Sequence, residues 1–371
     1  MTKILISLGT RPEFIKLYPL IKCFKRKKLF LINTSQHKSI LNNLVNKTNL
    51  KFDLKLSLKN KNLTLSKLFA DMLLKSNKVI TKLKPKIVVV QGDTASAAAV
   101  AMSSFHNQVP VAHVEAGLRT RKIYRPFPEE IYRQIITRVT KYNFAPTALN
   151  KKNLIKESCK GKIIITGNTV FDAIKIFYKK INIKKIKKEF KKKHGVEFNN
   201  KSIKILFTCH RRENYGSNFQ NICEAIKKIT KKYNNIEILY PLHHNPNFLK
   251  KAIMQFQNSK LVKLLPPLDY EKSLFLIKNC NLIISDSGGI QEEAAYFKKY
   301  VIVIREETER TEGVKLGIST ITKINVNSIV KKVVFYFKNQ SKIKLKLNKI
   351  KNPYLNCKSP SKKIFKILNK I

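Results

Sequence analysis

Acidic residues are scarce in this strongly basic chain, so the places where they gather are informative. Of 371 residues, 75 are Lys or Arg and only 23 are Asp or Glu. Carboxylates that gather at the ends of strands perturb one another's pKa, and such groups serve as general acids and bases. Thirteen of the 23 acids fall in seven short segments, most of which follow an apolar run: residues 9–13, 91–94, 113–120, 126–130, 210–214, 286–293 and 306–313.

The first half of the chain contains three candidates for acid–base chemistry. Asp93 follows the apolar run IVVV, Glu115 follows the run that begins VPVA, and Glu129 lies in the segment PFPEE. If the two runs are neighbouring parallel strands, Asp93 and Glu115 lie at the same sheet edge, where open α/β sheets bind ligands. Asp93 and Glu129 could also cap helix N-termini, and capping is compatible with catalysis.

A second group of residues suits a phosphate ligand. Ser287, Gly288 and Gly289 stand between an apolar run and a helical pattern, which predicts free backbone N–H groups at a helix N-terminus. A diphosphate fits such a site. The segment is neither GxGxxG nor a P-loop, so it favours neither NAD nor ATP. Glu293 lies two turns after Asp286 and is expected on the same side, within reach of ribose hydroxyls.

Basic side chains at strand ends add to the expected anion site. Arg11 follows the first apolar run, where it can pair with phosphate, and Pro12 suits the first turn of a helix. His210 follows another apolar run and is itself followed by two arginines, a setting that suits an anionic ligand. The pair His243 and His244 has no acid nearby, so we expect no metal site.

Short apolar runs alternate with amphipathic stretches along the chain. This pattern predicts an α/β architecture, in which strands from the apolar runs form parallel sheets that are covered by helices. A chain of this length exceeds one core, so we expect two domains. Residues 172–200 predict a solvated Lys-rich helix after the linker, and the last 14 residues predict a closing helix. The expected strands are Ile4–Leu8, Ile87–Val90, Val109–Val114, Ile203–Phe207, Ile236–Leu239, Leu282–Ser285 and Val301–Ile304.

The net charge of +52 is the most unusual bulk feature. We interpret it as compositional drift, because the basic residues are mostly Lys, are spread along the chain and accompany abundant Asn and Ile. We therefore expect no nucleic-acid partner, and a polyanion-binding protein is the alternative from a non-enzyme class. Six widely spaced cysteines predict reduced thiols. No apolar stretch approaches the roughly 18 residues of a membrane span, and we expect a cytoplasmic protein.

Taken together, these segments resemble the non-hydrolysing UDP-N-acetylglucosamine 2-epimerases over nearly the whole chain. The resemblance implies a GT-B type α/β fold: two Rossmann-like, doubly wound parallel-sheet domains with a cleft between them. Its expected domains are residues 1–170, with the helix at 358–371 packing back on them, and residues 171–357. The matching motifs are GTRPEFIK, QGDT, HVEAGLRT, PFPEE, TGNTVFDA, HRRENYG, HHNPN, SDSGGIQEEA and ETERTEGV.

The resemblance also implies a reaction and the residues that carry it out. Family members interconvert UDP-GlcNAc and UDP-ManNAc for cell-surface polysaccharides. They eliminate UDP to form a 2-acetamidoglucal and then add UDP back, without a metal or redox cofactor. Asp93, Glu115 and Glu129 become the acid–base candidates, assisted by His210 near the diphosphate. The resemblance implies a homodimer and these UDP-sugar contacts: Arg11, Lys16, Asp93, Glu115, His210, Ser287, Gly288, Gly289, Glu293 and Arg310.

Two enzyme alternatives remain beside this interpretation. The chain departs from the family pattern at Tyr132, at Thr311 and after Asn352–Tyr354. These departures leave room for an epimerase that acts on another UDP-2-acetamido sugar, in a 6-deoxy or uronic acid form. A GT-B glycosyltransferase would share the diphosphate site but would not need three clustered acids in the first domain.

Overall fold

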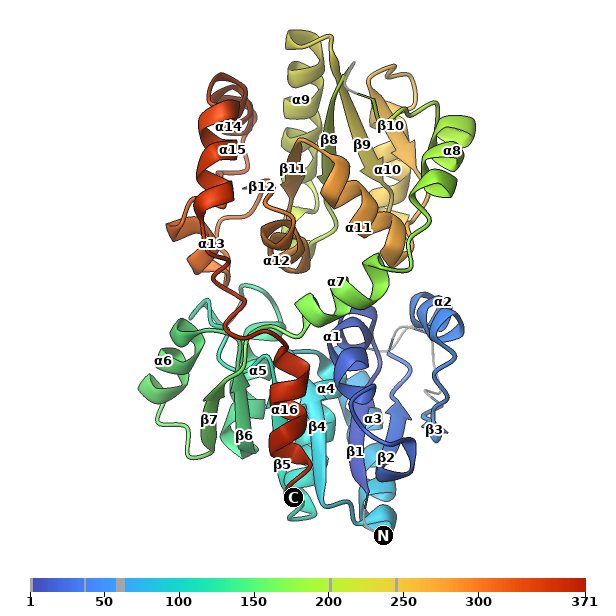
Figure 1. The fold of residues 1–371 in the computed structure, drawn as a ribbon, viewed down its shortest axis with the longest axis vertical. Helices are drawn as coiled ribbons and strands as arrows, with labels where there is room; N and C mark the ends of the chain where they lie inside the picture. Colours follow the sequence, from blue (N-terminus) through green and yellow to red (C-terminus); the bar gives the residue numbers. More distant parts are fainter. Residues whose placement is uncertain (1–2, 37, 58–63, 200–201, 244–245) are drawn as a thin grey trace. The chain divides into compact units, whose positions relative to one another are not determined.

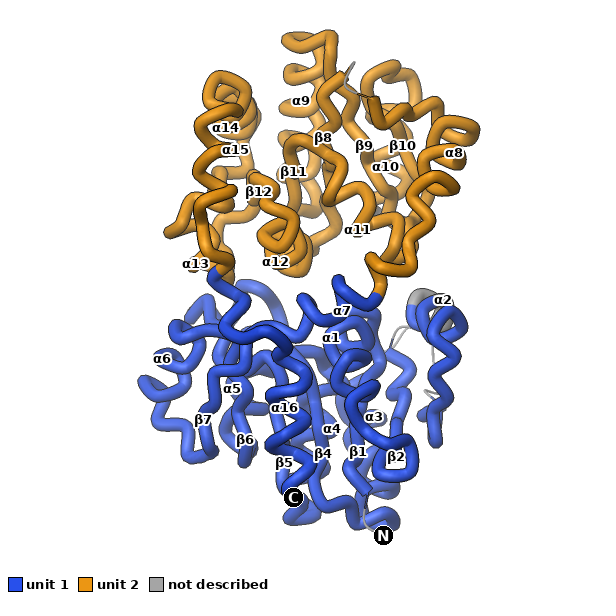
Figure 2. Tube along the Cα trace, viewed as in Figure 1, with its two compact units in different colours: residues 1–176, 353–371 blue, residues 177–352 orange. Residues whose placement is uncertain are grey.

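The chain folds into two compact units, each built around its own parallel sheet. A computed structural model describes residues 3–36, 38–57, 64–199, 202–243 and 246–371. Unit 1 comprises residues 1–176 and 353–371, and unit 2 comprises residues 177–352 (Figure 2). The boundaries thus fall a few residues from the expected ones, 170/171 and 357/358. Two parallel-sheet units confirm the predicted fold class.

Unit 1 contains a seven-stranded parallel sheet in the order β3-β2-β1-β4-β5-β6-β7. Helices cover both faces: α1 packs with α16 on one face, and α3, α4 and α5 pack together on the other (Figure 1). Its strands are β1 Ile4–Leu8, β2 Leu29–Asn33, β3 Leu54–Lys55, β4 Ile87–Gln91, β5 Val111–Val114, β6 Thr140–Ala145 and β7 Lys162–Ile165. Its helices are α1 Arg11–Ile21, η1 Arg26–Lys28, α2 Lys38–Thr48, α3 Leu65–Leu83, α4 Ala95–His106, α5 Glu129–Val139, α6 Ala148–Lys156, α7 Val170–Tyr178 and α16 Pro360–Leu368.

Unit 2 contains a six-stranded parallel sheet in the order β10-β9-β8-β11-β12-β13. The chain enters this unit near the end of α7 and leaves it before Pro353. Its strands are β8 Ile203–Thr208, β9 Ile236–Pro241, β10 Val262–Leu265, β11 Leu282–Ser285, β12 Tyr300–Val303 and β13 Ser319–Ile321. Its helices are α8 Ile183–His194, η2 Arg212–Asn214, α9 Ser217–Lys232, α10 Pro246–Phe256, α11 Tyr270–Asn279, α12 Gly288–Tyr296, α13 Thr311–Lys315, α14 Val326–Lys338 and α15 Gln340–Lys349.

The first strand and helix show how the sequence builds a strand end suited to a ligand. Every residue of β1 is buried, as its apolar run predicts. Gly9 follows, and a Cβ at this position would lie 1.7 Å from the Thr34 hydroxyl, so only glycine fits. Thr10 then caps α1, and Pro12 stands in the first turn, where a missing N–H costs nothing. The chain therefore turns sharply at the carboxyl end of β1.

The C-terminal segment returns to unit 1 and packs on α1, as the closing helix was expected to do. The rings of Phe24 and Phe365 pack edge to face, with centroids 4.8 Å apart. The Asp172 carboxylate accepts hydrogen bonds from the Ser361 backbone N–H at 2.8 Å and from the Ser359 hydroxyl at 3.1 Å. These bonds satisfy donors at the N-terminus of α16 and join it to α7.

Several predicted strands differ from the structure by one or two residues at an end, and two differences have a clear physical reason. Strand β5 begins at Val111 rather than Val109, because Pro110 has no N–H to donate to the ladder. Where one solvated helix was predicted after the linker, the structure has the two helices α7 and α8, and only α8 is solvated. Helix α7 buries Phe171, Ile174 and Phe177. Among the helices that the structure describes, none combines the length and the apolarity that crossing a membrane requires.

Candidate functional site

Asp93 and Glu115 lie at the carboxyl ends of adjacent strands, as predicted. Strands β4 and β5 pair in parallel with Gln91 opposite Val114, so each acid follows its strand by one or two residues. The backbone of Glu115 has φ = 71°, a left-handed conformation that is uncommon for a residue with a side chain. Such strain persists where the surroundings enforce it, and it gathers at functional sites.

The Glu115 carboxylate is buried and held by three polar groups. Lys16 forms an ion pair with one carboxylate oxygen, to which the Asn168 side-chain amide also donates a hydrogen bond at 3.5 Å. The Gln91 amide donates to the other oxygen. The side chains of Lys16 and Glu115 are each only 7% exposed, so this ion pair is largely shielded from solvent. Lys16, expected to contact UDP, therefore lies beside a proposed catalytic acid.

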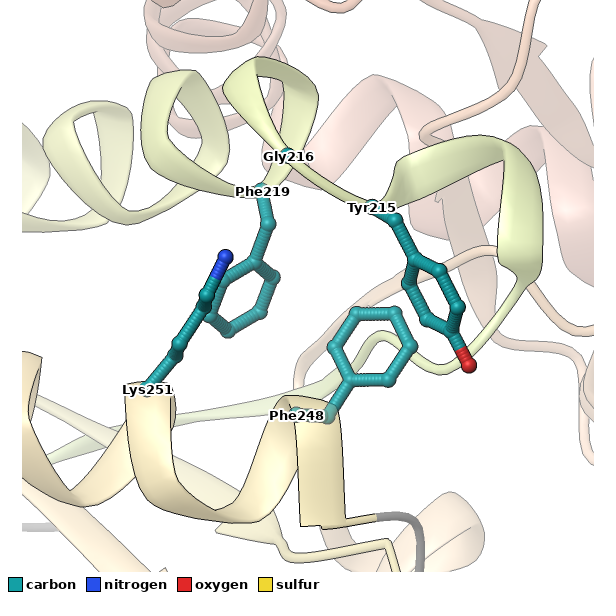
Figure 3. A pocket seen from close by; sticks show the side chains of 5 residues that line it. All are labelled: Tyr215, Gly216, Phe219, Phe248 and Lys251. Carbon is teal, nitrogen blue, oxygen red and sulfur yellow. The ribbon is translucent and has the colours of Figure 1, made fainter.

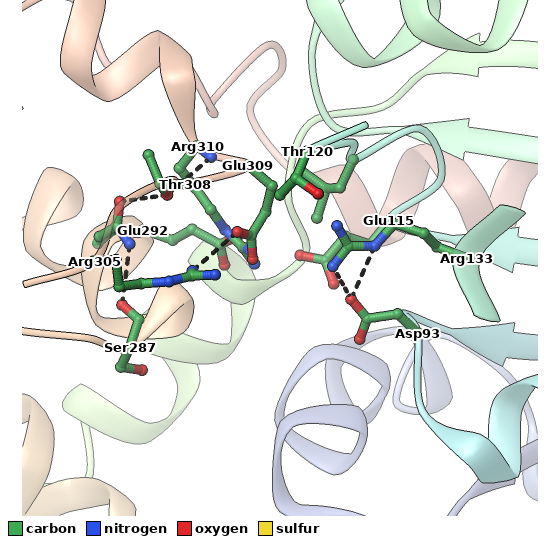
Figure 4. A network of polar contacts seen from close by, with 12 residues as sticks. Asp93, Glu115, Thr120, Arg133, Ser287, Glu292, Arg305, Thr308, Glu309 and Arg310 are labelled. Carbon is green, nitrogen blue, oxygen red and sulfur yellow. Dashed lines mark hydrogen bonds and ion pairs between the residues drawn. The ribbon is translucent and has the colours of Figure 1, made fainter. Parts of the chain in front are cut away.

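Asp93 is more accessible, and an arginine holds it. The Arg133 guanidinium in α5 donates two hydrogen bonds to one Asp93 oxygen, one of them from Nε at 3.2 Å, and a third to Glu130 at 2.9 Å (Figure 4). The Asp93 side chain remains 27% exposed, whereas Glu130 is fully buried. Glu130 also accepts the backbone N–H groups of Thr120 and Arg121 at 3.0 Å. Glu130 is thus a structural anchor, and Asp93 is the acid that faces solvent.

The capping alternative for Asp93 and Glu129 is wrong. The N-cap of α4 is Thr94, whose hydroxyl accepts the Ala97 N–H at 3.0 Å. Helix α5 is preceded by Pro128 without a side-chain cap, and Glu129 is the first residue inside the helix. The position of Glu129 in the first turn places a negative charge at the positive end of the helix dipole.

His113 is a buried histidine beside this group of acids. Its Nε2 lies 2.7 Å from the Gly92 carbonyl oxygen, and the ring has no exposed surface. Burial lowers the pKa of His113 from 6.5 to about 4, which keeps the ring neutral near pH 7. A neutral ring that donates from Nε2 holds the turn between Gln91 and Asp93.

Arg11 is the first residue of α1 and is partly exposed at the carboxyl end of the neighbouring strand, β1.

In unit 2, the predicted diphosphate segment forms a helix N-terminus. Ser287 caps α12, with its hydroxyl accepting the Ile290 N–H at 3.4 Å. Gly288 and Gly289 occupy the first turn, where backbone N–H groups have no acceptor within the helix. A Cβ on Gly288 would lie 2.7 Å from the Arg310 guanidinium, so glycine lets Arg310 pack against the helix start.

Arg310 belongs to a chain of alternating charges in unit 2. Its guanidinium donates to Glu292 at 2.9 Å and pairs with Glu309, and Glu309 also accepts from Arg305 at 3.0 Å (Figure 4). Arg305 in turn donates to Glu213 at 2.8 Å. Both arginines are largely buried. Carboxylates on either side thus fix the Arg310 side chain, which was expected to contact the diphosphate.

His210 lies over the buried carboxylate of Asp286. Its Nδ1 is 3.4 Å from an Asp286 oxygen, and its ring stacks on that of His243 with centroids 5.0 Å apart. Asp286 also accepts the N–H groups of His210 and Arg211, each at 2.8 Å. Burial alone raises the pKa of Asp286, but the charge of His210 and these hydrogen bonds outweigh it and hold the pKa below its usual range. Glu293 is buried in α12, the helix that follows Asp286 in the chain.

The predicted site residues therefore form two groups, one in each unit. Arg11, Lys16, Asp93, Glu115 and Glu129 lie in unit 1. The others lie in unit 2, on the elements that follow β8, β11 and β12. They are His210, Ser287, Gly288, Gly289, Glu293 and Arg310.

Sequence reasoning missed the residues that hold the acids in place. Arg133 and Asn168 are the main ones in unit 1, and Arg305 is their counterpart in unit 2. Arg133 lies one helical turn after Glu129 and Glu130, and this spacing was a usable signal. Asn168 carries no comparable local signal, because its partner is 53 residues away. Arg305 pairs with Glu309 four residues further on, which was a readable spacing, but its other partner, Glu213, is 92 residues away.

Other features of the described residues do not belong to the predicted site. A pocket of about 190 Å³ in unit 2 is lined by Tyr215, Gly216, Phe219, Phe248 and Lys251, none of them a predicted site residue (Figure 3). Within the described ranges, no group of three or more His, Cys, Asp or Glu side chains is placed to hold a metal ion. His244 of the HHNPN motif lies outside the described residues.

Comparisons with known proteins identify the family of the chain. A sequence model of the UDP-N-acetylglucosamine 2-epimerase family matches residues 22–369. The chain is 40% identical over 359 residues to a UDP-N-acetylglucosamine 2-epimerase of Campylobacter jejuni, covering 95% of this chain and 94% of that protein. Among solved structures, it is similar to the UDP-GlcNAc 2-epimerase of Neisseria meningitidis bound to UDP-GlcNAc (TM-score 0.93, 34% identity, 100% of both chains).

A second solved structure shows a similar likeness. The UDP-GlcNAc 2-epimerase of Methanocaldococcus jannaschii, in complex with UDP-GlcNAc and UDP, superposes with a TM-score of 0.83 at 34% identity, over 100% of both chains. The sequence similarity to these relatives covers nearly the whole chain, and the structural similarity covers all of it. The chain therefore belongs to the UDP-N-acetylglucosamine 2-epimerase family.

Proposed function

We propose that this enzyme interconverts UDP-GlcNAc and UDP-ManNAc by epimerisation at C2 without net hydrolysis. The observation that carries the proposal is the pair Asp93 and Glu115, held by cationic side chains at adjacent strand ends of unit 1. The family match supports the reaction, and relatives bound to UDP-GlcNAc support the substrate. The roles given below to individual residues are part of the proposal.

The reaction needs a base for the C2 proton and a leaving group at C1. Removal of the C2 proton and cleavage of the C1–O bond give a 2-acetamidoglucal and UDP. Addition of UDP to C1 and of a proton to the opposite face of C2 completes the epimerisation. The ion pairs with Arg133 and Lys16 hold Asp93 and Glu115, the two acids that we assign to proton transfer at C2, in place at their strand ends. Glu129 is the third acid that we assign to proton transfer.

The leaving diphosphate needs positive charge that is already in place. The N–H groups of Gly288 and Gly289 and the dipole of α12 supply it in unit 2, together with the fixed guanidinium of Arg310. His210 and Arg11 are the other cationic or hydrogen-bonding groups that we assign to the diphosphate, and Glu293 is assigned to the ribose. In this proposal the acid–base groups come from unit 1 and most diphosphate contacts come from unit 2.

The test is incubation with UDP-GlcNAc in deuterated water, followed by NMR of the sugar C2 position. We expect deuterium at C2 and accumulation of UDP-ManNAc. Asp93→Asn and Glu115→Gln should each slow the exchange by at least about a hundredfold, the scale of a lost acid or base. Asp71→Asn is the matched control, because Asp71 is a surface carboxylate in α3 that pairs with Lys75.

Each other outcome of this experiment points to a different enzyme. Free ManNAc with stoichiometric UDP would indicate a hydrolysing epimerase. Exchange only with a 6-deoxy or uronic acid form of the UDP-2-acetamido sugar would move the substrate to that class. No exchange with any of these UDP-sugars, together with sugar transfer to an acceptor, would replace epimerisation with glycosyl transfer.

We also propose that the enzyme works as a homodimer in the cytoplasm. Exposed apolar side chains on the packed helices α3 and α4, Leu74 at 64% and Phe105 at 56%, support a protein contact there. Sedimentation analysis should give twice the chain mass, and Leu74→Glu should shift the measured mass toward that of the monomer. A monomeric parent protein would refute the dimer.

The proposed location in the cytoplasm rests on the cysteines. All six are free thiols, which suits a reducing compartment.

A further inference from the structure

Glu13 is a fully buried carboxylate at the start of α1 to which the proposed reaction gives no role. One of its oxygens accepts the backbone N–H groups of Gly9 and Thr10, both at 2.7 Å. The Thr10 hydroxyl in return accepts the Glu13 N–H, which completes a capping box. Capping explains this oxygen, because it satisfies donors at the helix N-terminus.

The other oxygen of Glu13 reaches a different helix. It accepts hydrogen bonds from the Thr94 hydroxyl at 2.6 Å and from the Ser96 hydroxyl at 3.0 Å. These two residues cap and begin α4, 81 and 83 positions along the chain. Capping of α1 does not require these bonds. One carboxylate thus joins the turn after β1 to the turn after β4.

The two turns that Glu13 joins carry proposed site residues. Arg11 lies between Thr10 and Glu13 in the first turn, and Asp93 directly precedes Thr94 in the second. Burial raises the pKa of Glu13, because removing a carboxylate from water disfavours its charged form. Four donors on two oxygens offset part of that cost. Two of them are the hydroxyls of Thr94 and Ser96, which also lie 3.0 Å from each other.

We propose that Glu13 is a positioning residue that holds the Arg11 turn and the Asp93 turn in one fixed geometry. It contacts neither sugar nor diphosphate. The inference rests on the proposed function for the roles of Arg11 and Asp93, but the link between the two turns is independent of those roles. A misplacement of about 1 Å in a reacting group can lower the reaction rate about a hundredfold. Keeping the two turns at a fixed spacing therefore explains why a carboxylate is buried between them.

Two substitutions at Glu13 separate positioning from charge. Glu13→Ala removes both links. In Glu13→Gln the amide oxygen can accept the two backbone N–H groups, while its NH₂ donates to the hydroxyls of Thr94 and Ser96, which rotate to accept. We expect Glu13→Ala to lower kcat for C2 exchange about a hundredfold and to raise KM about tenfold. Glu13→Gln should stay within about threefold of the parent enzyme, since the hydrogen bonds persist.

A variant that is only destabilised serves as the matched control. Val100→Ala opens a cavity at a fully buried position in α4, away from the turn. It should lower the melting temperature and leave kcat and KM of the folded enzyme unchanged. A purely structural role for Glu13 predicts the same result for Glu13→Ala, and that result would overturn the proposal.

Amide hydrogen exchange tests the link without any catalysis. We expect Glu13→Ala to speed exchange about tenfold or more both at Gly9 and Thr10 and at residues 94–97, while Glu13→Gln leaves both turns protected. Unchanged protection at 94–97 in Glu13→Ala would overturn the link. If Glu13→Ala does not fold, Ser96→Ala removes one of the two α4 donors, and protected turns with unchanged kcat in that variant would also overturn it.

The hydrogen-exchange result also separates this inference from the proposed function. If the parent enzyme exchanges no deuterium at C2 of any UDP-2-acetamido sugar, the proposed reaction fails. Loss of protection at residues 94–97 in Glu13→Ala would still establish the link between the turns. Normal C2 exchange in the parent enzyme with an unaffected Glu13→Ala would instead leave the reaction standing and refute the role of Glu13.

Discussion

Acidification below pH 6.5 should destabilise this protein through His113. The imidazole is fully buried in β5 and lies 2.7 Å from the Gly92 carbonyl oxygen. Burial is the main cause that lowers its pKa from 6.5 to about 4, and the charges of Arg119 and Arg133 add to this effect. The folded protein therefore keeps His113 neutral at a pH where the unfolded chain has already bound a proton there.

The sign and size of the effect follow from the two pKa values. Between pH 6.5 and about 4 the unfolded state holds one more proton than the folded state, so the free energy of unfolding falls as the pH falls. The contribution of His113 is fully present above pH 6.5 and is lost by about pH 4. A difference of about 2.5 pKa units at 1.36 kcal/mol each gives about 3 kcal/mol.

His113→Gln isolates this contribution, because a Gln amide can still donate to the Gly92 carbonyl but does not titrate. The assay is urea unfolding of both proteins, followed by circular dichroism from pH 7 to pH 4. We expect the difference in free energy of unfolding, parent minus variant, to shrink by about 3 kcal/mol over that range. A difference that stays constant with pH would refute a buried neutral histidine at this position.

Three further predictions concern packing, charge and reactivity. Gly288→Ala should lower the free energy of unfolding by about 3 kcal/mol more than Gly289→Ala, because only the former displaces Arg310 from its carboxylates; thermal unfolding checks this. Arg133→Met should cost about 3 to 5 kcal/mol in urea unfolding, since it leaves a buried carboxylate unpaired; a smaller loss would contradict that role. Burial raises the pKa of Cys223 to about 12, so mass spectrometry should find it alkylated by iodoacetamide at pH 8 only after unfolding.

Most internal strands of the two sheets could be predicted from their apolar runs, but the internal strands β2 and β6 were missed, and so were the edge strands. Strand β4 is buried along its whole length, and its run of valines predicted it with its start at Ile87 unchanged. Edge strands such as β7, Lys162–Ile165, are only partly buried, and β10 is half exposed in its middle. Such strands have a weaker apolar pattern, and neither was predicted.

The acids of the site could be found from sequence because acids are rare in this chain, whereas the cations that hold them could not. With 75 Lys and Arg residues, the sequence does not show which one pairs with Asp93, although its spacing did point to the local pair of Arg133 with Glu130. That choice depends on the packing of α5 against β5, which places Arg133 beside the end of β4. Arg305 similarly meets Glu213 only because β12 and η2 come together in the fold, 92 residues apart.

The most direct test of the central claim is whether the C1–O bond breaks while UDP stays on the enzyme. UDP-GlcNAc labelled with ¹⁸O in the bridge between C1 and the β-phosphorus is incubated with the enzyme, and ³¹P NMR follows the label. Elimination and re-addition predict that ¹⁸O scrambles into the non-bridging β-phosphate positions as UDP-ManNAc forms. UDP-ManNAc that keeps all of its label in the bridge would contradict cleavage of this bond and, with it, the proposed mechanism.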